Sequence, residues 1–508
     1  MSAKRPASRL NTVIAAAILA LAVLATQLLG LGREVIDPDE STFILMGADV
    51  ARGHLPFVEQ FDLKPPMIFL LIGGVLALFG KSITAVRLLG DALIFGTAML
   101  TFGFARHLTG AWTALGGALL YVAFASLDLG QPTYSELPAL FFAMGALLAL
   151  AGTPVTLRHS ALAGFLLVLA VLSRTNLYLL PVVFGVLLLV AALRRSASVH
   201  RFAWLAFSLG GLVPVVLMVL AYAATGHIAV LRLAMIDVPL AYAQQVGPIE
   251  ALIENARQFY VVTTMEPLIV IPFVALSLLG VAIAAIRLAY PASAGERWRL
   301  IVLLIALPTL LVCVVLSGAV YPHYWLQILP VLAVFCAIGL GFVAGLPLGR
   351  WIGLLLVLVP LGTALTERLP SSLAVAAGTR SPPERFDIAA AADHIARSGL
   401  RDPSVWPLRM QLVDWYLDAP QLSKAGVQPE NIARPAIVGP LAAHGYVGSD
   451  ELGRIMALRP DFVVTDAAGK GIGWVRAVGR PVDGWLAANY RLDAQFGDVL
   501  VYRRINRP

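Results

Sequence analysis

The chain has 508 residues, of which 59% are apolar and 13% are charged. This composition excludes an ordinary soluble globule and is typical of a polytopic membrane protein. The formal net charge is +7, but no Lys/Arg-rich stripe with interleaved aromatic residues is present, so nucleic acid is excluded as a partner. We attribute the excess of basic residues to loops that face membrane lipids.

The apolar residues fall into long runs that predict about eleven transmembrane helices. The first run follows three basic residues and lacks the small-residue cleavage pattern of a signal peptide, so we expect it to be retained. The predicted spans are Asn11 to Leu31, Leu88 to Ala105, Trp112 to Leu127, Leu137 to Ala151, Ser160 to Leu172, Leu177 to Leu193, Phe202 to Ala224, Pro267 to Ile286, Leu300 to Ser317, Trp325 to Val343 and Trp351 to Leu365. Cys313 and Cys336 fall inside two of these runs, where buried free thiols are expected.

One further apolar run, Pro66 to Gly80, is short for a span and suits a helix that lies at the membrane interface. If it does not cross, the arginines of the loops lie on the side of the basic N-terminus. These residues are Arg106, Arg158, Arg194, Arg195, Arg201, Arg287, Arg297, Arg299 and Arg350. The positive-inside rule then places the N-terminus in the cytoplasm and the C-terminus outside.

Three outer segments are too long to be simple turns: Gly32 to Arg87, Thr225 to Glu266, and the chain after Leu369. The middle segment has the scattered apolar pattern of interfacial helices. The last has the composition of a soluble domain, with a helix predicted at Glu384 to Ser398 and strands at Asp461 to Thr465, near Tyr490 to Phe496 and at Asp498 to Tyr502. We therefore predict an α-helical membrane domain over residues 1–369 and a small extracytoplasmic α/β domain over residues 370–508.

The most informative motif is the acidic cluster that follows the first span. It consists of Asp37, Asp39 and Glu40, with Pro38 stiffening the turn and Asp39 placed to cap a helix that runs toward Arg52. A capped helix beside a solvated loop explains any one of these acids. Three carboxylates in four positions at a lipid interface repel one another, and a catalytic base or a ligand for a divalent cation would explain that cost.

A second motif, Asp62-Leu63-Lys64-Pro65-Pro66, follows in the same outer segment. Two prolines suit the start of a helix, whose unpaired first-turn amides attract anions, and Lys64 adds a full positive charge there. The alternative is a lysine that extends along the membrane interface beside such a helix. Its pairing with the acidic cluster favours a phosphate-binding site.

Polar residues at other predicted outer turns extend the list of candidates. Arg174 lies on the outer side against the charge trend, which makes it a second candidate for phosphate binding. Glu136 opens a span, and it suits a first-turn carboxylate and an active-site acid equally well. His323 and Tyr324 belong to an aromatic run typical of the membrane interface, where the histidine could donate a hydrogen bond to a phosphate or a sugar.

These motifs together resemble the bacterial branch of the GT-C glycosyltransferases, which includes the protein O-mannosyltransferase-like family and the lipid A aminoarabinose transferases. The similarity rests on the acidic pair after the first span, on Asp-x-Lys-Pro-Pro, on Arg87 before the next span, and on the run Tyr-Pro-His-Tyr-Trp-Leu-Gln-Ile-Leu-Pro from position 321. The chain has Leu63 directly before the lysine, where the aminoarabinose transferases usually have an acid.

The resemblance implies an enzyme that moves a sugar from a polyprenyl-phosphate carrier to a glycan, glycolipid or protein acceptor on the outer face, usually with inversion. It assigns Asp39 as general base or acceptor-positioning residue, with Asp37 and Glu40 beside it, and Lys64 as the residue that meets the carrier phosphate. Asp62, Arg87, Glu136 and Tyr324 are further active-site candidates. A divalent cation, Mg or Mn, is a candidate cofactor with Asp39 and Glu136 as ligands.

Two other functions suit a polytopic membrane protein with outer charges. A transporter or flippase is expected to show repeat symmetry and broken helices, and the sequence shows neither. A polymerase or ligase of lipid-linked polysaccharide shares the donor type and the topology, so it stays open as an alternative.

Overall fold

The structure is a computed structural model that describes residues 9–31, 33–127, 132–243, 247–317, 321–377, 387–469 and 482–505. By its internal contacts the chain divides into two compact units. The helical unit comprises residues 1–29, 87–220 and 246–374, and the mixed unit comprises residues 30–86, 221–245 and 375–508. The first outer segment therefore groups with the C-terminal part of the chain, although the sequence suggested a boundary between residues 369 and 370.

The helical unit contains the longer helices, most of which are apolar. They are α1 (Arg9–Leu31), α4 (Ile83–Arg106), α5 (Ala111–Ala125), α6 (Glu136–Leu150), α7 (Leu157–Ser173), α8 (Leu179–Leu193), α9 (Ala203–Ala224), α12 (Pro248–Met265), α13 (Pro267–Ala289), α14 (Ala294–Val315), α15 (Leu329–Val343) and α16 (Gly349–Ala376). Among the described residues, eight helical segments are long and apolar enough to cross a membrane, and α5, α6 and α7 are shorter apolar helices. Together these account for every predicted span, so the prediction of a polytopic membrane protein is confirmed.

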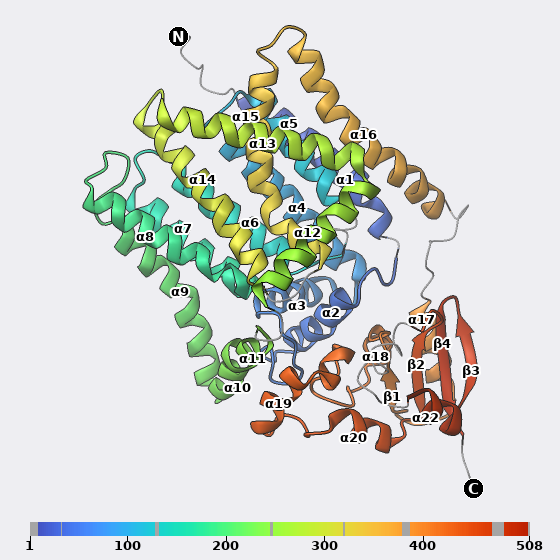
Figure 1. Cartoon of the computed structure of the whole chain (residues 1–508). Helices are drawn as coiled ribbons and strands as arrows, with labels where there is room; N and C mark the ends of the chain where they lie inside the picture. Colours follow the sequence, from blue (N-terminus) through green and yellow to red (C-terminus); the bar gives the residue numbers. More distant parts are fainter. Residues whose placement is uncertain are drawn as a thin grey trace. The chain divides into compact units, whose positions relative to one another are not determined.

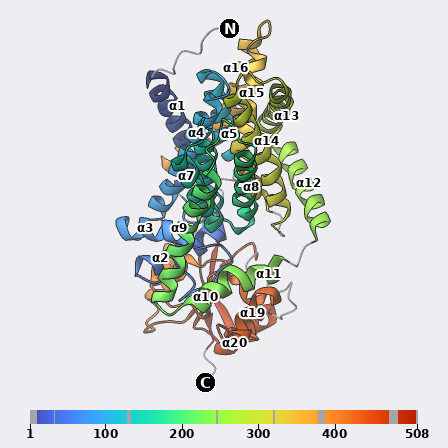
Figure 2. The ribbon, with the colours of Figure 1, turned by 90° about the vertical axis from the view of Figure 1, so that its left-hand side faces the viewer.

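The centre of the helical unit is formed by α15, which packs directly against α13 and α5 (Figures 1 and 2). Small residues allow this close approach. A Cβ atom on Gly280 of α13 would overlap the backbone carbonyl of Phe335, and one on Gly117 of α5 would lie 2.5 Å from the carbonyl oxygen of Ala333. Close backbone packing through small residues is how helices associate in lipid, where the hydrophobic effect does not drive them together.

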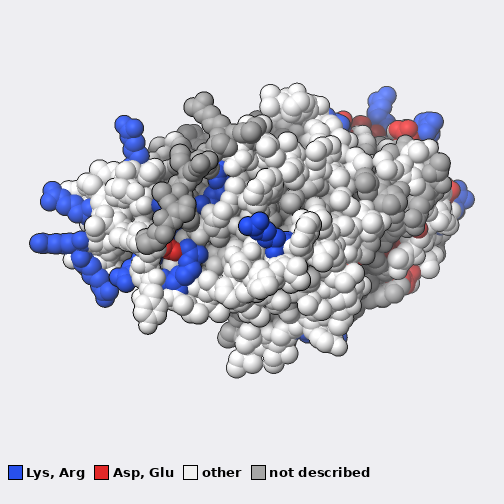
Figure 3. All heavy atoms as spheres, turned by 90° about the horizontal axis from the view of Figure 1, so that it is seen from above, with Lys and Arg blue, Asp and Glu red and all other residues white. Residues whose placement is uncertain are grey.

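The loops that carry most of the basic residues meet at one end of the helical unit. Arg287 donates to the carbonyl of Leu108 at 3.1 Å, and Arg299 donates to the carbonyl of Ala151 at 2.9 Å. Arg106 reaches Thr12, near the start of α1, at 2.8 Å. Figure 3 shows Lys and Arg side chains gathered on one side of the face it presents, with few acidic side chains among them. The basic loops and the start of α1 thus share one end, as the positive-inside argument requires.

The mixed unit combines the first outer segment with residues 221–245 and the C-terminal segment. Its helices are α2 (Pro38–Ala51), α3 (Met67–Phe79), α10 (Ile228–Arg232), α11 (Val238–Ala243), α17 (Ile388–Ala396), α18 (Leu412–Leu417), α19 (Pro435–Ala443), α20 (Glu451–Leu458) and α22 (Val482–Asn489). A π-helical turn, Leu233–Asp237, joins α10 to α11. The short apolar helix α3 packs against α2, and its Leu78 and Phe79 are exposed.

A four-stranded sheet in the order β1-β2-β4-β3 lies in the C-terminal part of the mixed unit. The strands are β1 (Val405–Pro407), β2 (Phe462–Asp466), β3 (Tyr490–Phe496) and β4 (Val499–Arg504). β2 is fully buried and pairs in parallel with β1 and antiparallel with β4. The predicted α/β composition of this segment is confirmed. The predicted helix from Glu384 is described only from Ile388, because residues 378–386 lie outside the described part of the chain.

Candidate active site

The acidic cluster begins helix α2, and its members have different environments. Asp37 is the N-cap: its backbone is extended, and its side chain accepts a hydrogen bond from the backbone N–H of Asp39 at 2.8 Å. Pro38 occupies the first helical position, where its fixed φ fits and no N–H is needed. The prediction that Asp39 caps this helix is therefore wrong by two residues. Asp39 lies in the first turn with its side chain available for other contacts.

Asp39 is paired with Lys64 from the second motif. The Lys64 Nζ atom lies 2.9 Å from Asp39 Oδ2 and 3.9 Å from Asp62 Oδ2, so the ammonium is held between two carboxylates. Asp62 also accepts the backbone N–H of Lys64 at 3.2 Å, a local turn that directs the lysine. The side chains of Asp39 and Lys64 are 18% and 17% exposed, whereas Asp62 is buried. The pair is thus shielded from bulk water and still reachable.

Lys64 also lies 5.6 Å from the centre of the Phe43 ring, which gives the charged end an aromatic face to rest on. Glu40, the third acid of the cluster, is 1% exposed in the first turn of α2. The structure therefore brings Asp39, Asp62 and Lys64 together and leaves Glu40 buried beside them.

A second charged cluster lies in the helical unit, at the end opposite the basic loops. Glu136 begins α6 and Arg174 follows the end of α7, and their side chains approach to 3.2 Å although both are buried. His323 lies 3.7 Å from the same Glu136 oxygen. The Arg174 guanidinium lies 4.3 Å from the centre of the Tyr324 ring. These four predicted site residues form one buried polar cluster among apolar helices.

Aromatic rings fix the position of His323 in this cluster. Its ring stacks on Tyr134 with a centroid separation of 4.4 Å and on Tyr321 at 5.6 Å. Residues 128–131, which precede Tyr134 by a few positions, lie outside the described part of the chain. Arg87, the last candidate, is 1% exposed within α4, which begins at Ile83 rather than at the predicted Leu88.

The sequence did not single out two amide side chains that contact Asp39 and Asp62. Gln428 Nε2 donates to Asp39 Oδ1 at 3.1 Å, and Asn431 Nδ2 donates to Asp62 Oδ1 at 3.2 Å. Both come from the C-terminal part of the mixed unit. No local signal in the sequence distinguishes them from other polar residues of a surface turn, because their partners lie far away along the chain.

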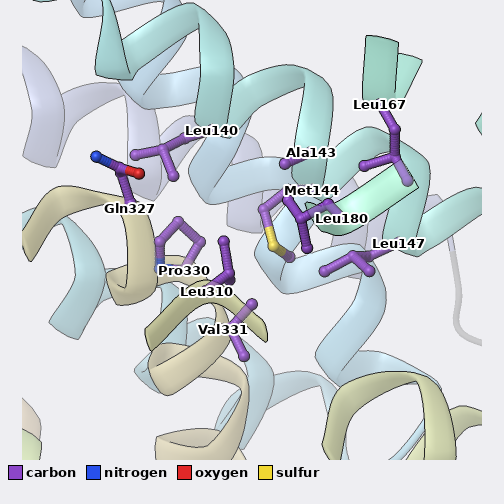
Figure 4. A pocket seen from close by; sticks show the side chains of 10 residues that line it. All are labelled: Leu140, Ala143, Met144, Leu147, Leu167, Leu180, Leu310, Gln327, Pro330 and Val331. Atoms are coloured by element: carbon purple, nitrogen blue, oxygen red, sulfur yellow. The ribbon is translucent and has the colours of Figure 1, made fainter. Parts of the chain in front are cut away.

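A small apolar pocket lies within the helical unit near the second cluster (Figure 4). Its walls come from α6, α7, α8, α14 and the start of α15, and Gln327 is its polar residue. The lining residues are Leu140, Ala143, Met144, Leu147, Leu167, Leu180, Leu310, Gln327, Pro330 and Val331. Asn176 Nδ2 donates to Gln327 Oε1 at 2.8 Å, which ties the polar edge of the pocket to the segment after Arg174.

Comparison with known proteins identifies the fold of the chain. No protein-family model matches the sequence, and no curated protein matches it. Among solved structures, ArnT from Cupriavidus metallidurans bound to undecaprenyl phosphate matches with a TM-score of 0.63 and 14% identity, over 98% of this chain and 99% of its own. AglB, the oligosaccharyltransferase of Archaeoglobus fulgidus, in complex with an inhibitory peptide and a dolichol-phosphate matches with a TM-score of 0.55 and 12% identity, over 98% of this chain and 74% of its own. The chain has the GT-C fold.

The GT-C fold confirms the architecture that the sequence motifs suggested. At this level of identity the likeness establishes the fold and not a subtype within it. In the GT-C fold of this chain, the Asp39–Lys64 pair belongs to the first outer segment, and the Glu136–Arg174 pair belongs to the helix ends opposite the basic loops.

A metal centre does not fit the acids as they are arranged. The Archaeoglobus fulgidus oligosaccharyltransferase has also been solved with Zn and sulfate, at a TM-score of 0.51 and 15% identity to this chain. In the described part of this chain, no group of three or more His, Cys, Asp or Glu side chains converges as metal ligands do. The proposed ligands Asp39 and Glu136 each face a cationic side chain, Lys64 and Arg174, which a metal ion would have to displace. These acids are therefore better suited to pairing with cationic side chains than to holding a metal ion.

Proposed function

We propose that the chain is a membrane glycosyltransferase that moves a sugar from a polyprenyl-phosphate carrier to a hydroxyl acceptor. The observation that carries this proposal is the partly shielded Asp39–Lys64 pair, with 2.9 Å between Nζ and Oδ2, in the first outer segment of a GT-C fold. The ArnT structure was solved with undecaprenyl phosphate and the AglB structure with dolichol-phosphate, and we extend this donor class to the present chain.

Lys64 has the properties needed at the leaving group. A prenyl phosphate departs already ionised, so a general acid is not required, and a fixed positive charge lowers the energy of the departing anion. The lysine ammonium has three N–H donors, so it can bind more than one oxygen of a donor phosphate.

Asp39 has the properties needed at the nucleophile. A carboxylate within hydrogen-bond reach of the acceptor hydroxyl accepts its proton as the new glycosidic bond forms. Inversion requires the acceptor and the phosphate to lie on opposite faces of the sugar. We therefore propose that Lys64 moves from Asp39 toward the phosphate when the donor binds, which frees the carboxylate to act as base.

We further propose on which side of the membrane this reaction takes place and to which branch of the GT-C glycosyltransferases the chain belongs. The end of the helical unit that carries the basic loops faces the cytoplasm, by the positive-inside rule, in a bacterial inner membrane. The first outer segment and residues 370–508 then lie in the periplasm or outside the cell, where the acceptor is a glycan, a glycolipid or a protein. The Asp-x-Lys-Pro-Pro motif favours the protein O-mannosyltransferase-like branch.

The oligosaccharyltransferase matches favour a second candidate, the transfer of a longer lipid-linked glycan by a polymerase or ligase. One experiment separates the two. The purified protein in lipid nanodiscs is incubated with polyprenyl-monophosphate sugars and with pyrophosphate-linked oligosaccharides, in the presence of a membrane and envelope extract as acceptor, and consumption is followed by mass spectrometry. We expect consumption of a monophosphate donor. Consumption of pyrophosphate-linked donors alone would identify the polymerase or ligase instead, and consumption of neither would refute the proposed function.

A further inference from the structure

We propose that Gln428 and Asn431, in the segment from Ser423 to Asn431, complete the proposed active site as positioning residues for Asp39 and Asp62. This inference rests on the proposed function. It gives the C-terminal part of the chain a role in the reaction itself, which neither the sequence motifs nor the fold assigns.

Gln428 holds Asp39 from the side opposite the lysine. Its Nε2 donates to Asp39 Oδ1 at 3.1 Å, while Lys64 binds Oδ2. The Gln428 carbonyl is itself fixed, because Thr42 Oγ1 donates to its Oε1 at 2.7 Å. Thr42 lies on α2 less than one turn after Asp39. The amide is therefore oriented by the same helix that carries the carboxylate.

Asn431 makes the matching contact to the second carboxylate. Its Nδ2 donates to Asp62 Oδ1 at 3.2 Å, and both side chains are buried, at 2% and 1% exposure. A buried carboxylate needs hydrogen-bond donors to remain ionised at low cost. Two carboxylates, two amides and one lysine thus form a single connected arrangement.

Backbone contacts hold the whole segment against the first outer segment. The N–H of Phe61 donates to the Lys424 carbonyl at 2.6 Å, and the Val427 carbonyl lies 3.0 Å from Thr42 Oγ1, whose single proton it shares with Gln428 Oε1. Lys424 Nζ donates to the Val58 carbonyl at 3.2 Å from an exposed position. The amides are therefore delivered by an ordered interface and not by a freely moving surface loop.

The chemistry of an amide suits this position. When Lys64 follows the phosphate, Asp39 loses its positive partner but keeps the Gln428 hydrogen bond. An amide donor orients a carboxylate without neutralising it, so the oxygen that faces the acceptor keeps its basicity. Loss of Gln428 should consequently reduce the catalytic step more than it reduces donor binding.

The test compares Gln428→Met with Lys424→Met in nanodiscs, using the polyprenyl-phosphate sugar that the wild-type protein consumes. Gln428→Met keeps the length of the side chain and removes its hydrogen bonds. Lys424→Met removes a contact between the same two segments without touching Asp39. We expect Gln428→Met to lower kcat by about tenfold or more with the donor KM changed by less than about twofold, a split that a mainly transition-state effect produces. Lys424→Met should leave both constants near the wild-type values.

A second measurement shows whether Gln428 acts through Asp39. Asp39→Asn and the double variant with Gln428→Met should retain the same residual rate, because the amide has no carboxylate left to orient. Wild-type kcat in Gln428→Met, an equal loss in Lys424→Met, or a further loss in the double variant would each overturn the inference while leaving the proposed function standing. A wild-type protein that consumes no lipid-linked sugar would remove both.

Discussion

Asp39 is the residue on which the proposed chemistry depends most directly. Asp39→Asn keeps the shape of the side chain and the hydrogen bond from Gln428, but it removes the basic carboxylate next to Lys64. We expect the transfer rate to fall by about 10²- to 10⁴-fold, the usual contribution of a general base. Expression, membrane insertion and the thermal unfolding temperature should stay close to those of the wild-type protein.

The measurement is the initial rate of donor consumption by matched amounts of purified protein. Glu59→Gln is the control, since it removes an exposed acid of the same outer segment. A near-normal rate in Asp39→Asn would exclude this residue as the base.

At the residue level, the sequence predicted part of the site because its members are close along the chain. Asp39 and Lys64 were singled out from two short motifs, and the structure places their side chains in contact. The role of each remains a prediction. Gln428 was missed because it reaches Asp39 across 389 residues of sequence, a separation that no local pattern records.

The ion pair between Glu136 and Arg174 joins the start of α6 to the end of α7, and it should stabilise the contact between these two helices. Arg174→Ala leaves Glu136 buried with its main cationic partner removed, which should destabilise the helical unit by about 3–5 kcal/mol. The double variant Glu136→Gln/Arg174→Met removes both charges and should be less destabilised than Arg174→Ala alone. Thermal unfolding in detergent measures the difference. An unchanged unfolding temperature in Arg174→Ala would mean that the pair does not stabilise these helix ends, and would favour the alternative role of Arg174 in phosphate binding.

Helix α18 carries a buried acid whose titration should be visible in stability. Burial raises the pKa of Asp414 well above its usual range, and the hydrogen bond from Gln421 offsets this only in part. Because the pKa of Asp414 is higher in the folded than in the unfolded state, the protonated carboxyl stabilises the folded protein at low pH. This stabilisation is lost as the pH rises through the folded-state pKa. Asp414→Asn cannot ionise, so its unfolding temperature should match the wild type in acid and exceed it increasingly as pH rises.

The control for this titration is Asp418→Asn, at the exposed end of the same helix. This variant separates the effect of burial from the loss of a carboxylate, because the Asp418 side chain is exposed. A constant difference between Asp414→Asn and the wild type across the pH range would show that this carboxyl does not titrate as described.

Elements with strong patterns were predicted well, and short ones were not. The closing strand Tyr490–Phe496 has the predicted bounds, and β2 is shifted by one residue, because runs of β-branched and aromatic residues between turn signals are informative. Strand β1 has only three residues and ends at Pro407, so its sequence carries too little periodicity to be recognised. The cap of α2 was misassigned because Pro38 fixes the first helical position and leaves capping to Asp37.

The whole molecule was predictable as a membrane protein from composition, since apolar runs in lipid must form helices whose backbone is internally hydrogen-bonded. The grouping of the first outer segment with the C-terminal part was not predictable from the sequence. It depends on contacts between distant residues, such as those of Thr42 with Val427 and Gln428. The sequence boundary between residues 369 and 370 marks a change of composition, and whether residues 370–508 fold alone stays a prediction.

The orientation in the membrane can be tested with single cysteines. Cys313 and Cys336 are buried, so the background of thiol labelling should be low. A membrane-impermeant thiol reagent added outside intact spheroplasts should label Arg397→Cys, in the exposed C-terminal part, and should label Arg158→Cys only after the membrane is opened. Both side chains replaced are exposed, so the fold should tolerate the changes. The reverse labelling pattern would invert the proposed topology.

The central claim, that the Asp39–Lys64 site binds a lipid phosphate, is tested most directly by native mass spectrometry of the purified protein titrated with undecaprenyl phosphate. Our account predicts binding to the wild-type protein and at least about tenfold weaker binding to Lys64→Ala, because a hydrogen bond to a charged group contributes about 1.5–3 kcal/mol. Lys81→Ala, which removes a lysine of the same segment that pairs with Asp418, should bind as the wild type does. Equal affinities of the wild-type and Lys64→Ala proteins would contradict the account.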